Sequence, residues 1–584
     1  MITPHKTRQN ISNFYQPIQM PGGYSWDHVD TLKRIDLYYN SRFESGQYDS
    51  HGFRKYFYNI TKPAIDIASK FVDLDTKDFI LTHEFPDQEW IVWVMMHDLK
   101  QWMKEQKFGT LLNQIAFNYS KYGHVVMKKV KKGKWKVVPL TNFRTDNTTE
   151  YLVNMEFVYE LVRMTAAEIR GMNWSEKAEI DTLLATDRPF YDIYECYDYN
   201  SETGGWDRTF KADLFTDNNK NISTEAMLTK EDQYAACLIL HKDEIDELPY
   251  RELKWESVPG RWLGFGFGEY LFDNQIRENE TTNLRARAMY ITSLILLQTR
   301  DETVGKNILN DLEMGDIIKT RDELRPVRNE ERNLPAYNVD DERWDKNSER
   351  KTFSFDIARG ENLPSATPLG VANLQAGMVT SYFELKRENL ALFIKDLILN
   401  DIIPSFKTEK AKRHQLTLLS NAEGVEKFTK AYLKTQIDKG ALDYAMNGNG
   451  FFPTPEQKLM EMDRLMSEMR GKRSVSIEIP DRIYTDAKYT FDIMVGEQTN
   501  PGALTQTLFT ALGTIASNPA ILQNKGTRTM LFKLLGQFGL SPIDLNLIES
   551  LMDEAPPVIN PLPAGPSMAA PTPGQPVQGG NRTY

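Results

Sequence analysis

A long helix-compatible stretch without a hydrophobic stripe limits the folds that are open to this chain. Residues 261–300 read RWLGFGFGEYLFDNQIRENETTNLRARAMYITSLILLQTR, and three alternating glycines near the start precede the helical pattern. A helix of about thirty residues is about 45 Å long. Within 273–287 only Ile276 and Leu284 are large and apolar, so this helix has no face for an ordinary core. We therefore expect it to bridge solvent or to pack against other polar helices.

A second charged segment and a loop follow this helix. Residues 338–361 read NVDDERWDKNSERKTFSFDIARGE and predict a shorter, highly charged helix. The loop ENLPSATPLG, residues 361–370, leads into a helix that becomes apolar nearly all round from Leu390 and should therefore enter a core. Pro404 is expected to end that helix, because proline removes a backbone donor from a helix interior.

The segments on either side of these helices mix helical and strand-like patterns. Apolar residues at helical spacing predict a helix that begins near Pro63 and two further helices within 87–119. The spacing changes to two in 122–146, YGHVVMKKVKKGKWKVVPLTNFRTD, which predicts a β-hairpin around the KKGK turn. Short strands and polar loops follow in 150–258, and 474–495 predicts a pair of strands. The fold class is therefore α+β.

The predicted hairpin is rich in lysine, with seven lysines between Lys121 and Lys136. This density could bind phosphate. A hairpin with one face in water also carries lysines, partly because they block pairing at an exposed strand edge. We favour the second interpretation, in which the lysines form a solvated face.

Composition narrows the class of protein. The chain has 584 residues, 41% hydrophobic and 26% charged, which is ordinary for a folded protein with about four domain-sized units. A formal net charge of −11 argues against a protein that wraps nucleic acid by neutralising many phosphates, although a local basic site stays open. Cys196 and Cys237 form no CxxC motif, which disfavours zinc ribbons, iron–sulfur clusters and a disulfide framework and fits a reducing cytosol.

Several common motifs are missing from the sequence. It contains no GxxxxGK[ST], GxSxG or HExxH, so we expect no P-loop, serine nucleophile, metal site or cofactor. GFGFG at 264–268 is not GxGxxG, and we interpret it as a flexible or tightly packed helix entry with Gly266 and Gly268 as the hinge. The N-terminal residues lack an apolar signal region, and the apolar runs 90–96 and 289–297 are too short to span a bilayer.

Carboxylate pairs are weak candidates for chemistry here. Asp340 and Asp341 lie in a charge-rich helix, as do Glu278 and Glu280, without apolar neighbours to raise a pKa. Solvated charge is the simpler interpretation. The missing motifs do not exclude an enzyme, since a glycosidase can place two carboxylates far apart in sequence. A carbohydrate-active hydrolase with distant paired carboxylates therefore stays open as an alternative.

The order of these parts resembles that of the portal proteins of tailed bacteriophages, over residues 50–550. The hairpin at 122–146 looks like the family's wing hairpin, and RWLGFGFGEYLFDNQIRENE looks like the glycine-rich entry to its first stem helix. The most specific match joins NVDDERWDKNSERK, LPSATPLG and the long helix ending in IIP, which resemble the second stem helix, the tunnel loop and the long wing helix. The resemblance implies a portal-like subunit without catalytic activity.

The resemblance also implies a division of the chain. The expected parts are an N-terminal arm and α+β wing (1–262), a first stem helix (263–300), a clip (301–337), a second stem helix (338–358), a tunnel loop (359–368), a long wing helix with the remaining wing (369–499), a helical crown (500–554) and a tail (555–584). The tail is rich in proline and glycine and is expected to be disordered.

Function and partners follow from the same resemblance. It implies a ring, a dodecamer in this family, at one capsid vertex of the virion, assembled in the host cytoplasm. Double-stranded DNA passes through the ring during packaging and ejection, with a large terminase, the major capsid protein or scaffold, and a later head–tail adaptor as partners. It also implies channel residues, namely the tunnel-loop residues Asn362, Ser365, Thr367 and Pro368 and the stem charges Arg285, Arg287, Lys346, Arg350, Lys351 and Arg359.

A ring would account for two features of the sequence. Identical copies packed side by side would support a polar helix, and an acidic or mixed-charge wall would let DNA slide. Thr367 can cap the helix that follows, with Pro368 at its first position, while small Ser365 and Ala366 allow close approach of other loops or DNA. Without the resemblance, the loop is an ordinary helix–helix turn. A virion scaffold protein that forms oligomers but conducts no DNA is a further alternative.

Overall fold

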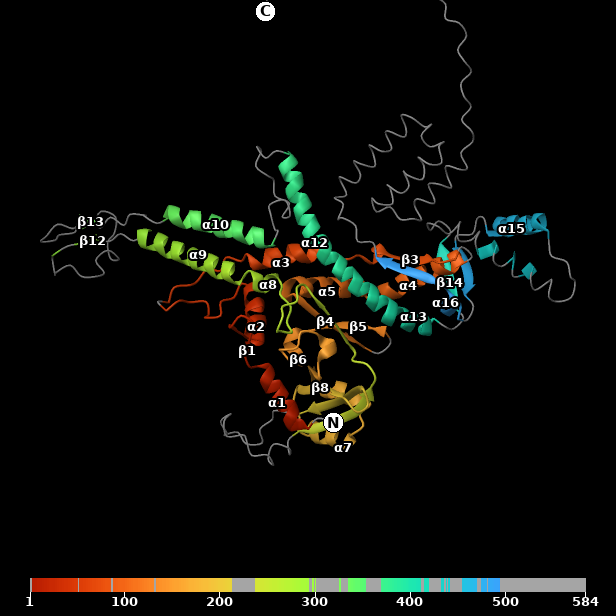
Figure 1. Cartoon of the computed structure of the whole chain (residues 1–584), viewed down its shortest axis with the longest axis horizontal. Helices are drawn as coiled ribbons and strands as arrows, with labels where there is room; N and C mark the ends of the chain where they lie inside the picture. The colour runs from red at the N-terminus through yellow and green to blue at the C-terminus, as the bar shows by residue number, and fades with distance from the viewer. Residues whose placement is uncertain are drawn as a thin grey trace, which may run out of the picture. The chain divides into compact units, whose positions relative to one another are not determined.

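The chain has a mixed α+β fold in a computed structural model (Figure 1). It divides into two compact units, Met1–Leu418 with Lys430–Gln498, and Leu419–Thr429 with Thr499–Tyr584. The structure describes residues 3–50, 52–85, 88–130, 133–212, 237–293, 297–298, 300, 325–326, 334–352, 369–410, 414–419, 432–434, 437–438, 440–441, 454–469, 474–479 and 482–493. The predicted crown and tail therefore lie outside the described residues.

The described helices and strands follow the chain in this order. The helices are α1 (Pro4–Phe14), α2 (His28–Tyr39), α3 (Thr61–Val72), α4 (Glu89–Glu105), α5 (Phe108–Tyr122), α6 (Ala166–Gly171), α7 (Lys177–Leu184), α8 (Phe267–Tyr270), α9 (Phe272–Ser293), α10 (Leu334–Thr352), α12 (Leu369–Leu397), α13 (Ile403–Glu409), α15 (Pro455–Met469) and α16 (Ile483–Asp486). The strands are β1 (Ile18–Gln19), β2 (Ser25–Trp26), β3 (Phe79–His83), β4 (His124–Lys129), β5 (Trp135–Val138), β6 (Phe143–Thr145), β7 (Phe157–Met164), β8 (Tyr191–Asn200), β9 (Gly205–Ala212), β10 (Leu238–Ile245), β11 (Tyr250–Lys254), β12 (Leu297–Gln298), β13 (Arg325–Pro326), β14 (His414–Leu419), β15 (Ser474–Ile479) and β16 (Tyr489–Ile493).

An antiparallel sheet in the order β10-β9-β8-β7-β6 forms the largest strand region. Neighbours along the chain are also neighbours in the sheet, as expected for strands that alternate with short turns. Ile169 and Leu183, from α6 and α7, pack with Ile193 and Leu240 of the sheet. Ile11 of α1 belongs to a separate buried cluster with Tyr159, Tyr194 and Cys196. The sheet therefore has apolar contacts with helices from two parts of the chain.

The predicted lysine-rich hairpin is confirmed as β4 and β5, which pair antiparallel, with β11 on the other side of β4. The solvated face expected for its lysines is wrong for Lys128, whereas Lys129 and Lys136 are exposed and form ion pairs at the surface. Lys128 is buried and bonded to Glu160, and Lys129 pairs with Asp401 at 2.7 Å. Lys136 also reaches Glu160, at 2.8 Å. Acidic residues distant in sequence bind these lysines, so the local pattern could not reveal their partners.

Three glycines allow two backbone segments to cross at the entry to α8. Gly123, which ends α5, has a left-handed backbone with φ +69°, and a Cβ there would lie 2.3 Å from the backbone nitrogen of Gly266. A Cβ on Gly264 would lie 2.1 Å from the carbonyl oxygen of Gly123. Trp255 and Phe265 hold the crossing through backbone hydrogen bonds of 2.9 Å to Gly123 and Glu256. Of the two interpretations of GFGFG, the structure therefore favours the tightly packed helix entry.

The helix after the predicted loop enters a core as expected, but Pro404 does not end it. Leu390 and Ile394 of α12 are buried, and Phe383 stacks on Phe71 of α3 with ring centres 5.0 Å apart. Regular α-helix stops at Leu397 and is followed by a π-helical turn, Ile398–Ile402, and then by α13. Pro404 lies in the first turn of α13, directly after this π-helical turn, so the chain stays helical past the proline.

The two strands predicted within 474–495 exist, but they do not pair with each other. β15 pairs with β14, whereas β16 pairs antiparallel with β3, so that Phe491 faces Leu81 in the register. Phe491 and Phe79 are buried, with ring centres 5.9 Å apart. β16 also contacts α12, where Lys395 pairs with Asp492 at 3.2 Å, so tertiary contacts rather than a local turn determine where β16 pairs. α16 also contacts α4, since Tyr484 donates a 2.6 Å hydrogen bond to Asp98.

Candidate functional site

Helices α9 and α10 lie side by side and form the candidate site (Figure 1). The predicted first stem helix is shorter than expected, because α9 ends at Ser293 and Leu297 already belongs to β12. The second charged helix is confirmed as α10, which begins earlier than expected, at Leu334. β12 pairs antiparallel with β13, between the two helices in sequence. The expectation that the polar helix packs against another polar helix is confirmed.

Ion pairs and hydrogen bonds join α9 to α10. Arg277 contacts Asp340 at 2.8 Å, and Arg285 forms an ion pair and a hydrogen bond with Asp341. A hydrogen bond rather than an ion pair joins the start of α9 to the end of α10, because the Lys351 ammonium donates to the Asn274 side chain at 2.8 Å. Since later residues of α9 meet earlier residues of α10, the helices run antiparallel. Arg285 and Lys351, expected to face a channel, therefore bind within the subunit.

A glutamate is buried in this charged interface. Glu278 is only 2% exposed, and its Oε1 accepts no hydrogen bond from the described residues. Burial raises its pKa to about 8, with further increases from Asp345, Asp341 and Asp340 of α10. The expectation that Glu278 is a solvated charge is wrong, because the facing helix excludes water from it.

The opposite side of α9 binds residues 56–61, the segment that leads into α3 and ends with its first residue, Thr61. Three side-chain amides at four-residue spacing, Gln275, Asn279 and Asn283, make these contacts, and we call them the amide ladder. Asn283 accepts a hydrogen bond from the Tyr56 backbone N–H at 2.7 Å and donates one to the Tyr56 carbonyl at 2.9 Å. A side chain of α9 thus satisfies both backbone hydrogen-bonding groups of Tyr56.

The other two rungs complete the amide ladder. Asn279 accepts from the Tyr58 N–H at 2.9 Å. Gln275 accepts from the N–H groups of Ile60 and Thr61 at 3.1 and 3.2 Å, and donates to the Tyr58 carbonyl. The backbone N–H groups of Tyr56, Tyr58 and Ile60, at every second residue, thus meet amides at every fourth residue of α9. α9 therefore lacks an apolar stripe because polar partners contact two of its sides.

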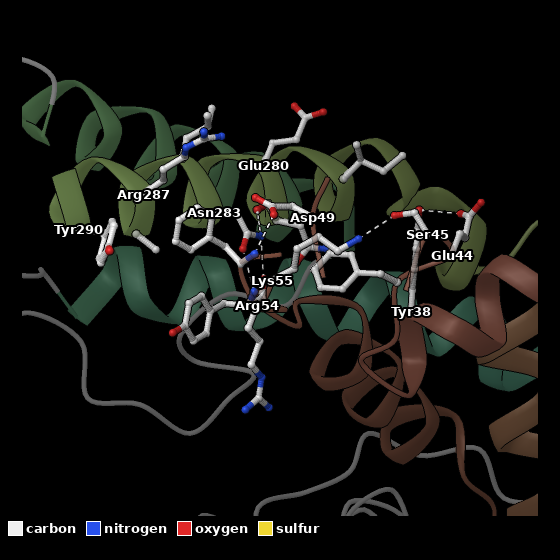
Figure 2. Close-up of a pocket in the computed structure, with 17 residues that line it drawn as sticks. Tyr38, Glu44, Ser45, Asp49, Arg54, Lys55, Glu280, Asn283, Arg287 and Tyr290 are labelled. Carbon is white, nitrogen blue, oxygen red and sulfur yellow. Dashed lines mark hydrogen bonds between the residues drawn. The ribbon is translucent and has the colours of Figure 1, made fainter. Parts of the chain in front are cut away.

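An open groove of about 860 Å³ lies between α9 and a small hairpin that directly precedes residues 56–61. The hairpin spans 47–55, with the Lys55 N–H bonded to the Gln47 carbonyl at 2.8 Å. Figure 2 shows the groove running along α9, with Tyr38 and Ser45 toward one end and Tyr290 toward the other. The ring of Phe53 lies 5.5 Å from that of Tyr290, which links the hairpin to α9.

Large apolar side chains remain exposed around this groove. We call residues 47–58 the arm. Its Tyr48 is 64% exposed and its Tyr56 is 56% exposed, while Leu284 and Tyr290 are each 49% exposed on α9. Charged side chains of both signs line the same groove, among them Arg54, Lys55, Glu44, Glu280 and Arg287. Aromatic and arginine side chains gathered on one surface are typical of protein–protein interfaces.

The remaining predicted channel charges lie at the surface. Arg287 lines the groove, and its guanidinium has no ion pair among the described residues. Lys346 and Arg350 are exposed on α10 together with Arg343, at spacings of three and four residues that place them on one face. We call these three the basic stripe. The predicted residues Arg359, Asn362, Ser365, Thr367 and Pro368 lie outside the described residues.

Two buried carboxylates elsewhere bear on the hydrolase alternative. Glu160 and Glu195 are direct partners on β7 and β8, and the Lys128 ammonium binds both. Burial raises the pKa of Glu160, but Lys128 and Lys136 outweigh burial and hold this pKa below its ordinary value. A general acid requires the opposite shift. This pair is therefore suited to structural ion pairing.

The described residues offer neither a metal centre nor a membrane-spanning helix. No group of three or more His, Cys, Asp or Glu side chains is placed to hold a metal ion in that part of the chain. No helix in the same ranges is long and apolar enough to cross a membrane.

No family model matches the sequence, and no curated protein matches it either. The function must therefore be argued from the residues themselves.

The sequence contained one signal that we did not use. Gln275, Asn279 and Asn283 recur every four residues, which places three amides on one side of a helix. That repeat predicts a polar partner with exposed backbone groups. Nothing in the sequence identifies the partner as 56–61, because more than two hundred residues separate the two segments.

Replacing Asn279 by alanine should release the arm from α9. The Tyr58 N–H would lose its acceptor, and an unsatisfied donor of this kind costs about 1–3 kcal/mol. We expect limited proteolysis within 44–58 to become about tenfold faster, or more, at unchanged global stability. Thr282→Ala, on the same helix, is the matched control and should behave like the wild type. Equal cleavage rates for Asn279→Ala and wild type would show that the amide ladder does not hold the arm.

Proposed function

We propose that this chain is the subunit of a ring that conducts double-stranded DNA, a portal of the kind found in tailed bacteriophages. The observation that carries the proposal is the basic stripe on α10. Arg343, Lys346 and Arg350 are exposed on one face, over about 10 Å along the helix, in a chain of net charge −11. A channel wall with few cations, in a protein that is acidic overall, would contact DNA phosphates without binding the DNA tightly.

The pairing of α9 with α10 supports this arrangement. Because Arg277 and Arg285 form ion pairs with α10 of the same subunit, these two arginines do not need partners from a neighbouring copy. The outer face of α10 is then free to line a channel. The exposed aromatic groove beside α9 supports contacts between neighbouring subunits. The same proposal places the ring at a capsid vertex, with a terminase, a capsid or scaffold protein, and a head–tail adaptor as partners.

The assembly state of the purified chain tests the proposal first. Native mass measurement and electron microscopy should show closed rings of about a dozen subunits with an open axial hole. A chain that stays monomeric over a range of salt concentrations would overturn the proposal and favour the alternative of a carbohydrate-active hydrolase. A ring whose axis is closed would instead identify an oligomeric scaffold protein.

The basic stripe predicts a salt-dependent contact with DNA. Changing Arg343, Lys346 and Arg350 together to glutamine should leave ring formation intact and weaken DNA binding to the purified ring. The slope of log affinity against log salt should fall by about two to three, because each lost phosphate contact removes roughly one unit. A control variant changes Lys134 and Lys242, exposed lysines outside α10, to glutamine and should keep the slope. An unchanged slope in the stripe variant would show that α10 does not face DNA.

A further inference from the structure

We propose that Glu278 is a proton-operated latch between α9 and α10. With a proton on its carboxyl group the two helices pack together, and loss of that proton weakens their packing. The proposal does not depend on the proposed function, because it concerns two helices of one subunit.

Geometry is the first support. Glu278 is 2% exposed, and the facing helix and its own neighbours exclude water from its Oε1. Its Oε1 has no hydrogen-bond partner among the described residues, and neither has Oδ1 of Asp341 on the facing helix. An ionised carboxylate in such a place loses its hydration without compensation. Protonation removes the charge and adds a hydrogen-bond donor.

The surrounding charges also favour the protonated form of Glu278. α10 presents three carboxylates to Glu278, those of Asp340, Asp341 and Asp345, each of which favours its neutral form. On α9 itself, Arg285 is the cation that favours the ionised form.

The nearby cations are already engaged. The ion pairs Arg277–Asp340 and Arg285–Asp341 occupy the two arginines that join α9 to α10. Lys351, near one end of the helix pair, donates to Asn274. Glu278 itself has no ion pair among the described residues, so ionisation would add an uncompensated negative charge to this interface.

A proton fits this place better than a metal ion. In the described part of the chain, no three acidic, histidine or cysteine side chains converge on a point where they could hold a cation. The buried oxygens of Glu278 and Asp341 belong to facing helices, and a divalent cation such as Ca²⁺ needs six to eight oxygen ligands. A single proton needs only one of these oxygens. Added Ca²⁺ or Mg²⁺ therefore separates the two possibilities experimentally.

The direction of the pH effect follows from the pKa. The pKa of Glu278 rises from its ordinary 4.5 to about 8 when the helices pack. Packed helices therefore bind the proton more tightly than separated ones, and packing is strongest below pH 4.5. It weakens as the pH rises from 4.5 toward 8 and changes no further above 8. Around neutral pH, a small change in acidity then alters the packing of α9 and α10.

Hydrogen exchange of the full-length protein, read by mass spectrometry on α9 and α10 peptides, tests the latch. The exchange protection, corrected for the intrinsic effect of pH, should fall about fiftyfold between pH 6 and pH 8 in the wild type. Glu278→Gln removes the titrating group and keeps the shape, so its protection should stay nearly constant across this range. Glu280→Gln, two residues away and exposed, is the matched control and should keep the wild-type pH dependence.

The other outcomes would overturn the proposal. Wild-type protection that does not change between pH 6 and pH 8 would mean that the Glu278 proton does not control packing. A Glu278→Gln variant that keeps the wild-type dependence would assign the effect to another group. If Ca²⁺ or Mg²⁺ raised the protection of the wild type at pH 8 to its value at pH 6, and had no such effect on Glu278→Gln, the site would bind a cation instead of a proton. Ring formation is measured separately, so either idea can fail alone.

Discussion

Gly123→Ala is expected to lower the free energy of unfolding by at least about 4 kcal/mol. Its Cβ would lie 2.3 Å from both the Gly266 nitrogen and the Phe265 carbonyl carbon, distances that no side-chain rotation can relieve because all the atoms are backbone. Gly123 also has φ +69°, a conformation that alanine adopts only with strain. The crossing of the α5 end with the entry to α8 would have to open, and the packing around it would be lost.

A second glycine in α5 provides the control. Gly109 is exposed in the first turn of this helix, and a Cβ there would meet nothing within 4 Å. Gly109→Ala should therefore leave stability unchanged or raise it by up to about 1 kcal/mol, because alanine favours helix. Chemical denaturation of the three proteins gives the comparison. A Gly123→Ala protein within 1 kcal/mol of wild type would mean that the two backbones do not cross as closely as described.

Local patterns predicted the elements of this fold well. α3, α4 and α5 and the β4–β5 hairpin follow from helical or two-residue spacing, because each buries a face whose pattern is written in consecutive residues. Pairing between distant strands was not predictable. β16 pairs with β3 across some four hundred residues, and only the shared core around Phe79 and Phe491 selects this partner.

The candidate site was predictable only in outline. The sequence showed that α9 lacks an apolar stripe and that a charged helix follows, which led to the correct expectation of polar helix packing. It did not show that α9 satisfies its polar side chains within the subunit, through Asn279 on one side and Arg277 on another. The polar sequence of α9 thus needs no neighbouring copy, and the groove and the basic stripe are the features that favour the proposed ring.

Buried charges were the least predictable feature. Glu278 and Lys128 both occur in charge-rich local sequence, where solvation is the natural expectation. Both are buried because a segment from elsewhere covers them, α10 in one case and the β7–β8 pair in the other. Lys128 has two carboxylate partners and stays charged, whereas Glu278 faces carboxylates and favours its neutral form. Burial alone therefore does not determine whether a side chain is charged, because the sign of the neighbouring charges also matters.

Lys128→Met should destabilise the protein by about 3–5 kcal/mol at neutral pH, the range observed when one partner of a buried ion pair is removed. The Lys128 ammonium binds Glu160 at 2.6 Å and also Glu195, and it lies 5.2 Å from the centre of the Tyr250 ring. Methionine fills a similar volume, so the loss is mainly electrostatic. Two buried carboxylates would then face each other across β7 and β8, with only partial compensation from Lys136 at Glu160 and from Arg208, 3.9 Å from Glu195.

Two further variants decide whether charge or packing causes this loss. Adding Glu160→Gln and Glu195→Gln to Lys128→Met removes the uncompensated charges and should recover at least half of the lost stability. Lys134→Met, at an exposed position of the same hairpin, should change stability by less than about 0.5 kcal/mol. Denaturant midpoints at one pH give all four values. If the triple variant is as unstable as Lys128→Met alone, the lysine contributes through packing, and the ion network has no separate role in holding β4 against β7 and β8.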